Sequence, residues 1–275
     1  IIMKKLGFLF MLLVLLASAG EACTNFLVGK KASADGSVFI SYSADSYGMS
    51  GFVAHFPAAI HPEGAMREIY NWDSGDYIGS IPEARVTYNV LGNINEHQVA
   101  IAETTFGGRE ELVDTTGLID YGNLIYIALQ RSRTAREAID VMTSLVAEYG
   151  YYSSGESFSI ADPNEAWILE MIGKGGKEKG AVWVAIRIPD DCISAHANQA
   201  RIRKFDMKDK ENVRYSKDVI KFARKMGYFD GKDEDFDFAA AYCPADFGGL
   251  RYCDARVWSF FNMFGAEDMT KYLAW

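Results

Sequence analysis

Cys23 is the residue whose setting most clearly suggests chemistry, because it follows a run of small residues in the stretch ASAGEAC (17–23). Cleavage after Ala22 would make Cys23 the first residue of the mature protein, with a thiol and a free α-amino group on one residue. Those two groups have ordinary pKa values within about one unit of each other, so the amine can accept the thiol proton, directly or through a water. One residue would then supply both the nucleophile and the general base of an acyl transfer.

The segment before Cys23 has the pattern of a secretory signal peptide. Lys4–Lys5 precede the unbroken apolar run 6–17, and cleavage would place small residues at −1 (Ala22) and −3 (Gly20), where signal peptidase reads them. The run is well short of the ~20 apolar residues of a membrane-spanning helix, and no later run approaches that length. We therefore expect residues 1–22 to be removed on export to the periplasm or the extracellular space, and we expect no membrane span.

Three other interpretations of Cys23 stay open. A lipoprotein also begins with cysteine, although its processing site favours Leu at −3 and a small residue at −2, where this chain has Gly20 and Glu21. Acylation of the amine would remove the general base. A structural disulfide from Cys23 and a cleavage site one or two residues away are the other two alternatives.

The composition argues against a polyanionic partner and says nothing about a small substrate. The 275-residue chain carries a formal net charge of −9 and has no cluster of Lys and Arg, which argues against nucleic acid or an anionic membrane as partner. The residues after the signal peptide are enough for one large domain, 23–275.

The four cysteines of an exported chain suggest disulfides, and they allow three pairings. If Cys23 is reserved for chemistry, we favour a Cys243–Cys253 bridge, which leaves Cys192 unpaired. The alternative is that all four cysteines are reduced or buried.

A β-strand must position Cys23. The stretches CTNFLVG (23–29), KKASADG (30–36) and SVFISYS (37–43) predict strand, turn and strand, with Asp35-Gly36 at the turn. Further strands are predicted at 52–56, 85–91, 99–106, 157–162, 166–172 and 181–188, with a turn at 162–166.

Helical periodicity is present in three segments, Tyr121–Ser132, Thr134–Tyr149 and Ser216–Met226. Thr134 and Glu137 form a capping box, and Gly150 follows the second helix. For the third helix we expect Ser216 as N-cap and Gly227 as the end. Because the helices are grouped between sets of strands, the predicted class is α+β.

Five sequence blocks add a family resemblance: CTNFLVGKKASADGS (23–37), NINEHQVAIAETTFGG (93–108), GYYSSGESFSIADPNEAWILEMIGKG (150–175), SAHANQARI (194–202) and FGGLRYCDARVWSFFNMF (247–264). Together they resemble the cysteine dipeptidases of the N-terminal-nucleophile (Ntn) hydrolases, the group that contains dipeptidase A and the secernins. The resemblance covers nearly the whole mature chain and implies a four-layer αββα sandwich. Relatives in that group are much longer, so it also implies a chain truncated at its C-terminus. The apolar segment 256–275 agrees with this, although an ordinary terminal helix is the alternative.

The resemblance implies that Cys23 is the nucleophile and that Asp45 lies beside it, where its carboxylate would orient the α-ammonium group. The alternative for Asp45 is a turn residue before Ser46. The family pattern has an Arg where this chain has Tyr42, which leaves open how the thiolate is held.

Further roles follow from the same resemblance. Asn198 matches the asparagine that binds the reacting carbonyl, and Thr105, through its own N–H or that of Phe106, takes the place of a second oxyanion donor. Glu103 and Arg256 would contact the charged ends of a dipeptide. A core salt bridge or a strand-end charge is the alternative for each.

No metal or cofactor is expected. The four histidines show no ligand spacing such as HExxH, and each is interpreted as a surface or satisfied histidine: His55, His61, His97 and His196.

The sequence therefore predicts an exported cysteine dipeptidase whose partner is a small peptide, with homo-oligomerisation left open. The first alternative is an N-acyl amide hydrolase of the bile-salt or penicillin amidase kind, which would bind an apolar acyl group. The second is an inactive, lipid-anchored binding protein. The acidic chain favours a substrate with a free ammonium group.

Overall fold

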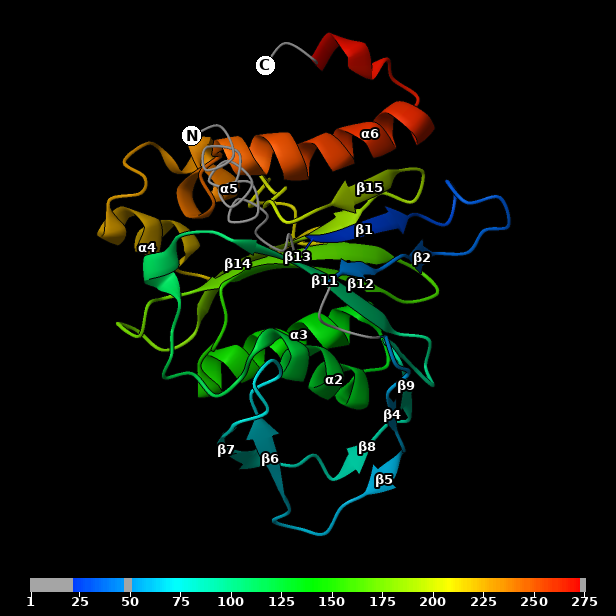
Figure 1. Cartoon of the computed structure of the whole chain (residues 1–275), viewed down its shortest axis with the longest axis vertical. Coiled ribbons are helices and arrows are strands. Elements are labelled where there is room, and N and C mark those ends of the chain that lie inside the picture. Colours follow the sequence, from blue (N-terminus) through cyan, green and yellow to red (C-terminus); the bar gives the residue numbers. More distant parts are fainter. Residues whose placement is uncertain (1–21, 47–50, 273–275) are drawn as a thin grey trace, which may run out of the picture.

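The computed structural model describes residues 22–46 and 51–272 (Figure 1). The predicted signal peptide, up to residue 21, lies outside the described residues. Within the described residues, no helix has the length and apolar character needed to cross a bilayer.

The largest element is an antiparallel sheet of eight strands in the order β16-β14-β13-β12-β11-β10-β9-β4. Its long central strands are β11 (Ala100–Gly107), β12 (Gly155–Ala161), β13 (Ala166–Gly173) and β14 (Ala181–Ile188). Short strands extend it on both sides: β4 (His55–Phe56), β9 (Val90–Leu91), β10 (Ile94–Asn95) and β16 (Val213–Tyr215). Every residue of β12 and β13 is buried, so both faces of the sheet are covered.

A second antiparallel sheet carries Cys23. Its central strand β1 (Ala22–Val28) pairs with β15 (Ile193–His196) on one edge, and with β2 (Phe39–Ile40) and β3 (Ser43–Asp45) on the other. The predicted strand, turn and strand are confirmed, and Gly36 in the turn has a φ of +81°. The register places Cys23 opposite Ala44.

Helices pack against the sheets: α2 (Tyr121–Arg131), α3 (Ala135–Tyr149), α4 (Val219–Met226), α5 (Phe238–Tyr242) and α6 (Ala255–Phe264). One apolar core joins α2 and α3 to a face of the eight-stranded sheet, with Leu129 and Ile101 among its members. A second core, on the opposite face of that sheet, includes residues of β1, α4 and α5.

A third, smaller core packs α6 against β1 and β15. In it the rings of Phe26 and Phe260 are stacked with centroids 4.2 Å apart. Figure 1 shows α6 on the outer side of the β1 and β15 sheet, and α2 and α3 beyond the larger sheet. The mixture of helices with antiparallel sheets confirms the predicted α+β class.

The two central helices begin and end as predicted, within one or two residues. The side chain of Thr134 accepts a hydrogen bond from the N–H of Glu137, and the Glu137 carboxylate accepts one from the N–H of Arg133. Gly150, with a φ of +82°, ends α3.

Thr134→Ala is expected to destabilise the protein by about 1 kcal/mol, because an orphan N–H in the first turn of α3 would lose its side-chain acceptor. Urea denaturation checks this, with Thr134→Ser as the variant that keeps the acceptor. An unchanged midpoint in Thr134→Ala would show that water replaces the cap at no cost.

The third helix differs from the prediction at its start. It begins at Val219 rather than near Ser216, and no side chain caps it. The Ser216 side chain instead accepts from the N–H of Trp183 in β14, a contact across the sheet edge that local sequence does not show. Its predicted end at Gly227 is confirmed.

The region between β3 and β11 is less regular than predicted. The runs 52–56 and 85–91 form only two-residue pairings, in β4, in β9 and in β8 (Val86–Thr87), which pairs with β5 (Ala59–Ile60). A hairpin that the sequence did not predict, β6 (Met66–Tyr70) with β7 (Tyr77–Pro82), buries Ile69 and Ile81 in the first core.

The favoured Cys243–Cys253 disulfide is wrong, because all four cysteines are free thiols. Cys243 ends α5, is buried, and its thiol faces the carbonyl oxygen of Phe106 at 3.7 Å. Cys253 lies in the π-helical turn η3 (Gly249–Asp254) that leads into α6. The alternative interpretation, in which the cysteines are reduced, agrees with the structure.

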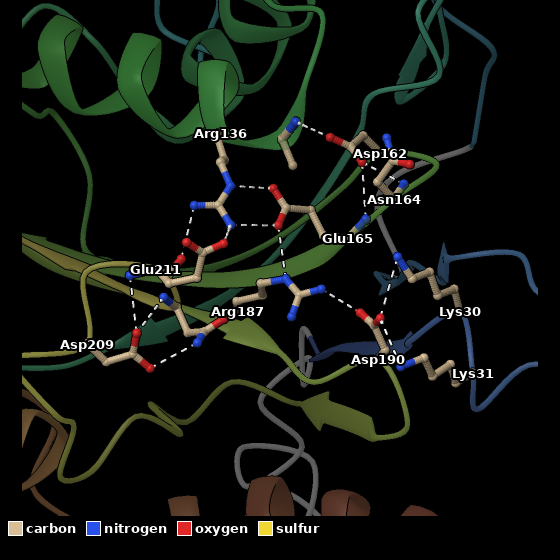
Figure 2. Close-up of polar contacts among 12 residues, drawn as sticks. Lys30, Lys31, Arg136, Asp162, Asn164, Glu165, Arg187, Asp190, Asp209 and Glu211 are labelled. Atoms are coloured by element: carbon tan, nitrogen blue, oxygen red, sulfur yellow. Dashed lines mark hydrogen bonds and ion pairs between the residues drawn. The ribbon is translucent and has the colours of Figure 1, made fainter.

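An ionic network fastens the turn between β12 and β13 to its surroundings (Figure 2). Glu165 receives hydrogen bonds from Arg136 of α3 (2.7 and 2.9 Å) and from Arg187 of β14 (3.0 Å). Arg187 also pairs with Asp190, which Lys30 of the first hairpin approaches to 3.4 Å. The network ties the hairpin that carries Cys23 to the larger sheet.

Candidate active site

Strand β1 brings Cys23 to two residues that are far away in the sequence. Its backbone nitrogen donates to Oδ1 of Asn198 at 2.7 Å, and its carbonyl oxygen accepts from Nη1 of Arg256 at 2.6 Å. Cys23 is half-buried. The fold therefore holds the backbone of the predicted nucleophile on both sides.

Asn198 lies in the loop that follows β15 and has a left-handed φ of +54°, a conformation that asparagine tolerates better than most residues. Its Nδ2 donates to the carbonyl oxygen of Thr105 at 2.8 Å. A few residues further along this loop, the N–H groups of Arg201 and Ile202 donate hydrogen bonds to the carboxylate of buried Glu170 (2.6 and 3.0 Å). These bonds hold the loop in place. Burial raises the pKa of Glu170 to about 7, although these hydrogen bonds oppose the shift.

Arg256 is occupied by internal contacts. Nη1 also donates to Oγ1 of Thr24 at 2.7 Å, and Nη2 donates to Oδ1 of Asn198 at 2.9 Å. Nε donates to the carbonyl oxygen of Tyr252 at 2.7 Å. The guanidinium thus positions Cys23 and Asn198 together, which makes it a positioning residue in the structure.

Arg256→Lys is expected to lower kcat by about 10- to 100-fold with little change in KM, because an ammonium group cannot bridge Cys23 and Asn198 as the fork does. Steady-state kinetics on protein prepared to begin with Cys23 check this, with exposed Arg251→Lys as the matched control. A loss confined to KM would instead assign Arg256 to substrate binding.

Asp45 affects the pKa of the Cys23 thiol through its backbone N–H and through its carboxylate. It is the exposed end of β3, and its Oδ1 accepts from the hydroxyl of Ser43 at 2.9 Å. Its N–H lowers the pKa of the Cys23 thiol, whereas its carboxylate raises it.

The Cys23 thiol is in an environment that opposes its ionisation. Burial, followed by the negative charges of Glu103, Glu156 and Asp45, raises the pKa of the thiol to about 12. In a chain that still carries Ala22, the thiol is therefore neutral at physiological pH and a weak nucleophile.

Two buried carboxyl groups lie next to this thiol. Tyr42, in the place of the expected Arg, donates its hydroxyl proton to Oε1 of Glu103 at 2.6 Å. Thr105 donates its hydroxyl proton to Oε1 of Glu156 at 2.8 Å, and the two residues face each other across β11 and β12. Strand alternation places Glu103 and Thr105 on one face of β11.

A cavity of about 670 Å³ opens next to the acidic pair, with Thr105 and Glu156 in its wall. Asp73, Tyr121 and Trp72 also line it, and the Tyr121 hydroxyl donates to Oδ1 of Asp73 at 2.8 Å. None of these residues lines the smaller cavity of about 430 Å³ beside Gln199.

Of the four histidines, His196 lies in the interior of this region. It is fully buried between the two sheets, hydrogen-bonded at Nδ1 to Thr104 (2.6 Å) and at Nε2 to Ser159 (2.7 Å). Burial and the charge of Arg201 lower its pKa to about 3, so it is neutral. Among the described residues, no group of three or more acidic, His or Cys side chains is arranged to hold a metal ion.

The structure brings all six predicted site residues into one neighbourhood: Cys23, Asp45, Glu103, Thr105, Asn198 and Arg256. Sequence reasoning missed Glu156, Asp73 and Tyr121. Glu156 is the second residue of β12 and pairs with Thr105 of β11, so the register of the two strands would have revealed it. Asp73 and Tyr121 reach the cavity only through tertiary packing.

The chain is similar to several bacterial proteins named as dipeptidases. It is 29% identical to a probable dipeptidase of Salmonella dublin over 88% of this chain and 58% of that protein. It is 28% identical to a probable dipeptidase of Latilactobacillus sakei (86% and 52%) and 30% identical to a probable dipeptidase A of Streptococcus pyogenes (73% and 45%). The chain thus spans about half the length of the curated relatives it matches.

A family model matches nearly all of the described chain, from residue 22 to residue 272. The match begins one residue before Cys23 and continues through α6, so it includes every site residue named above. The chain belongs to peptidase family C69.

Proposed function

We propose that the mature protein is an exported dipeptidase in which Cys23, freed by cleavage after Ala22, attacks the peptide carbonyl. The observation that carries the proposal is the 2.7 Å contact between the Cys23 nitrogen and Oδ1 of Asn198. After cleavage that nitrogen would be a free amine, held by an acceptor beside its own thiol. The dipeptidase names of the relatives support the substrate class.

Cleavage would also change the electrostatics of the thiol. The α-amine takes the thiol proton, and the resulting ammonium group places a positive charge on the same residue as the thiolate. This charge offsets the carboxylates that raise the pKa of the thiol in the uncleaved chain. Tyr42 stands where the family pattern has an Arg, and its side chain carries no positive charge. The α-ammonium group would therefore have to supply that charge.

The cycle then follows two-step acyl transfer. The thiolate sulfur bonds to the carbonyl carbon, and one N–H of Asn198 Nδ2 stabilises the oxyanion, because its other N–H is used by Thr105. The C–N bond breaks as the Cys23 ammonium protonates the leaving amine. Water, deprotonated by the same amine, hydrolyses the thioester and returns the thiol.

The layers described above agree with the four-layer αββα sandwich of Ntn hydrolases, which we include in the proposal. Cores lie between α6 and the smaller sheet, on the face of the larger sheet towards β1, and between the larger sheet and α2 with α3. In this arrangement β1 is held between packed layers, which would keep Cys23 in a fixed position.

The test combines N-terminal mapping with a substrate panel. The product exported from the complete gene is expected to begin with an unmodified Cys23 and to hydrolyse dipeptides in preference to N-acyl amides. Hydrolysis of N-acyl amides alone would favour the amidase alternative. A diacylglycerol adduct on Cys23 would favour the lipid-anchored alternative.

A further inference from the structure

We infer that the buried pair Glu103 and Glu156 is the subsite that binds the α-ammonium group of the first residue of a dipeptide substrate. A free amino terminus would then be the main requirement for a substrate. This inference rests on the dipeptidase function proposed above, and it adds the group that is recognised and the residues that recognise it.

Each of the two carboxyl groups is buried with one oxygen left free. Glu103 is 3% exposed and Glu156 is 1% exposed. Tyr42 and Thr105 each hold one oxygen of one carboxyl group, whereas Oε2 of Glu103 and Oε2 of Glu156 have no hydrogen-bond partner in the described part of the chain. Buried acceptors are rarely left without a donor, so these two oxygens are positions where the N–H groups of a ligand could donate hydrogen bonds.

The pair also lacks a cation. No Lys, Arg or His of the described residues forms an ion pair with either carboxylate. Burial and then the negative charge of Glu103 raise the pKa of Glu156 well above its usual range. Two buried negative charges disfavour each other at this position, and the positive charge of a bound ammonium group would offset them.

The adjoining cavity selects for positive charge. At about 670 Å³ it is within the size range of small-molecule sites. Its wall contains the carboxyl groups of Glu156 and Asp73, whereas none of the described residues that line it is Lys, Arg or His. A carboxylate end of a dipeptide would meet repulsion there, but an ammonium end would not.

The carboxyl pair lies near the nucleophile, as this end of a dipeptide requires. The α-nitrogen of the first residue is two bonds from the attacked carbonyl carbon, or about 2.5 Å away, so its subsite must adjoin the thiol. Glu103 and Glu156 are close enough to raise the pKa of that thiol by their charge. Thr105 links the nucleophile's surroundings to the carboxyl pair. Its carbonyl oxygen accepts a hydrogen bond from Asn198, and its hydroxyl donates one to Glu156.

The Cys23 amine does not compete for these oxygens. Its nitrogen donates a hydrogen bond to Oδ1 of Asn198 rather than to either carboxyl group. The two nitrogens therefore have separate partners, one for the general base and one for the substrate.

The experiment compares alanyl-alanine with propionyl-alanine, which differs only by hydrogen in place of the α-amino group. In the processed wild-type protein, the loss of that group is expected to lower kcat/KM by at least about 30-fold. In the Glu103→Gln/Glu156→Gln double variant, the two compounds are expected to differ by less than about threefold, because the partner charge is gone. Exposed Glu110→Gln is the matched control and keeps the wild-type ratio.

A double variant that lowers both rates equally would overturn the inference and leave the dipeptidase function standing. If the wild-type protein hydrolysed neither compound, the proposed function would fail, and binding would decide the inference separately. Calorimetric titration of Cys23→Ala, in which both carboxyl groups are intact, is expected to show alanyl-alanine binding at least about 30-fold more tightly than propionyl-alanine. Equal binding would overturn the inference even if the double variant failed to fold.

Discussion

Cys23→Ala is expected to lower the proposed dipeptide hydrolysis at least about 1,000-fold in protein prepared to begin at position 23, while the protein stays folded. The substitution removes the sulfur that would form the acyl intermediate, and oxyanion donors and binding groups alone retain only a small part of the rate. The side chain is half-buried at the end of β1, so a smaller alanine leaves the strand pairing with Ala44 in place. Steady-state kinetics and a thermal melt measure the two effects.

Cys192→Ala is the matched control for this prediction. Cys192 is an exposed free thiol in the loop before β15, and it lies outside the site described above. Its loss is expected to leave kcat/KM within about twofold of wild type, as is usual for surface substitutions. Turnover that persisted in Cys23→Ala but fell in Cys192→Ala would reject Cys23 as the nucleophile.

A protein with one glycine before Cys23 is expected to be at least about 100-fold less active than the protein that begins with Cys23. The extension keeps the thiol but turns its amine into an amide, which cannot accept a proton, and general-base catalysis of this kind contributes about 10²–10⁴ in rate. Two forms of the complete protein, released from a tag with or without the glycine, provide the comparison.

The same two forms should differ in how fast iodoacetamide alkylates the thiol. With an amide at position 23, the pKa of the thiol is raised to about 12, so the reactive thiolate increases with pH up to that value and is scarce at pH 7. With a free amine, the expected reaction at pH 7 is faster, because the ammonium group stabilises the thiolate. Equal alkylation and equal turnover in both forms would remove the role assigned to the amine.

Local sequence was informative where the chemistry is local. The order of apolar run, polar turn with Asp35-Gly36 and second apolar run predicted the hairpin that carries the nucleophile, and the spacing in 134–149 predicted α3 with its cap at Thr134. Those features depend on residues within a few positions of each other, so short-range periodicity and capping rules reach them. The same rules failed at Ser216, whose hydroxyl was taken by Trp183 from another strand.

Family resemblance extended the prediction to residues that are far apart in the chain, but it did not show their contacts. Asn198 was expected to serve the reacting carbonyl, and the structure adds that its Oδ1 holds the Cys23 nitrogen. Arg256 was expected to meet substrate, and the structure shows its guanidinium holding Cys23 and Asn198. The favoured disulfide failed for the same reason, since spacing alone does not say whether two thiols meet.

By itself, the sequence determined that a cysteine stands at a cleavage-like junction and begins a strand, because both signals lie in consecutive residues. Only the tertiary structure decided what surrounds that cysteine. The carboxyl pair arises from the register of β11 on β12, and the cavity beside it is completed by Asp73 and by Tyr121 at the start of α2. The solvent exposure and the pKa of a group in a site depend on everything that packs around it, so they are set only when the chain is folded.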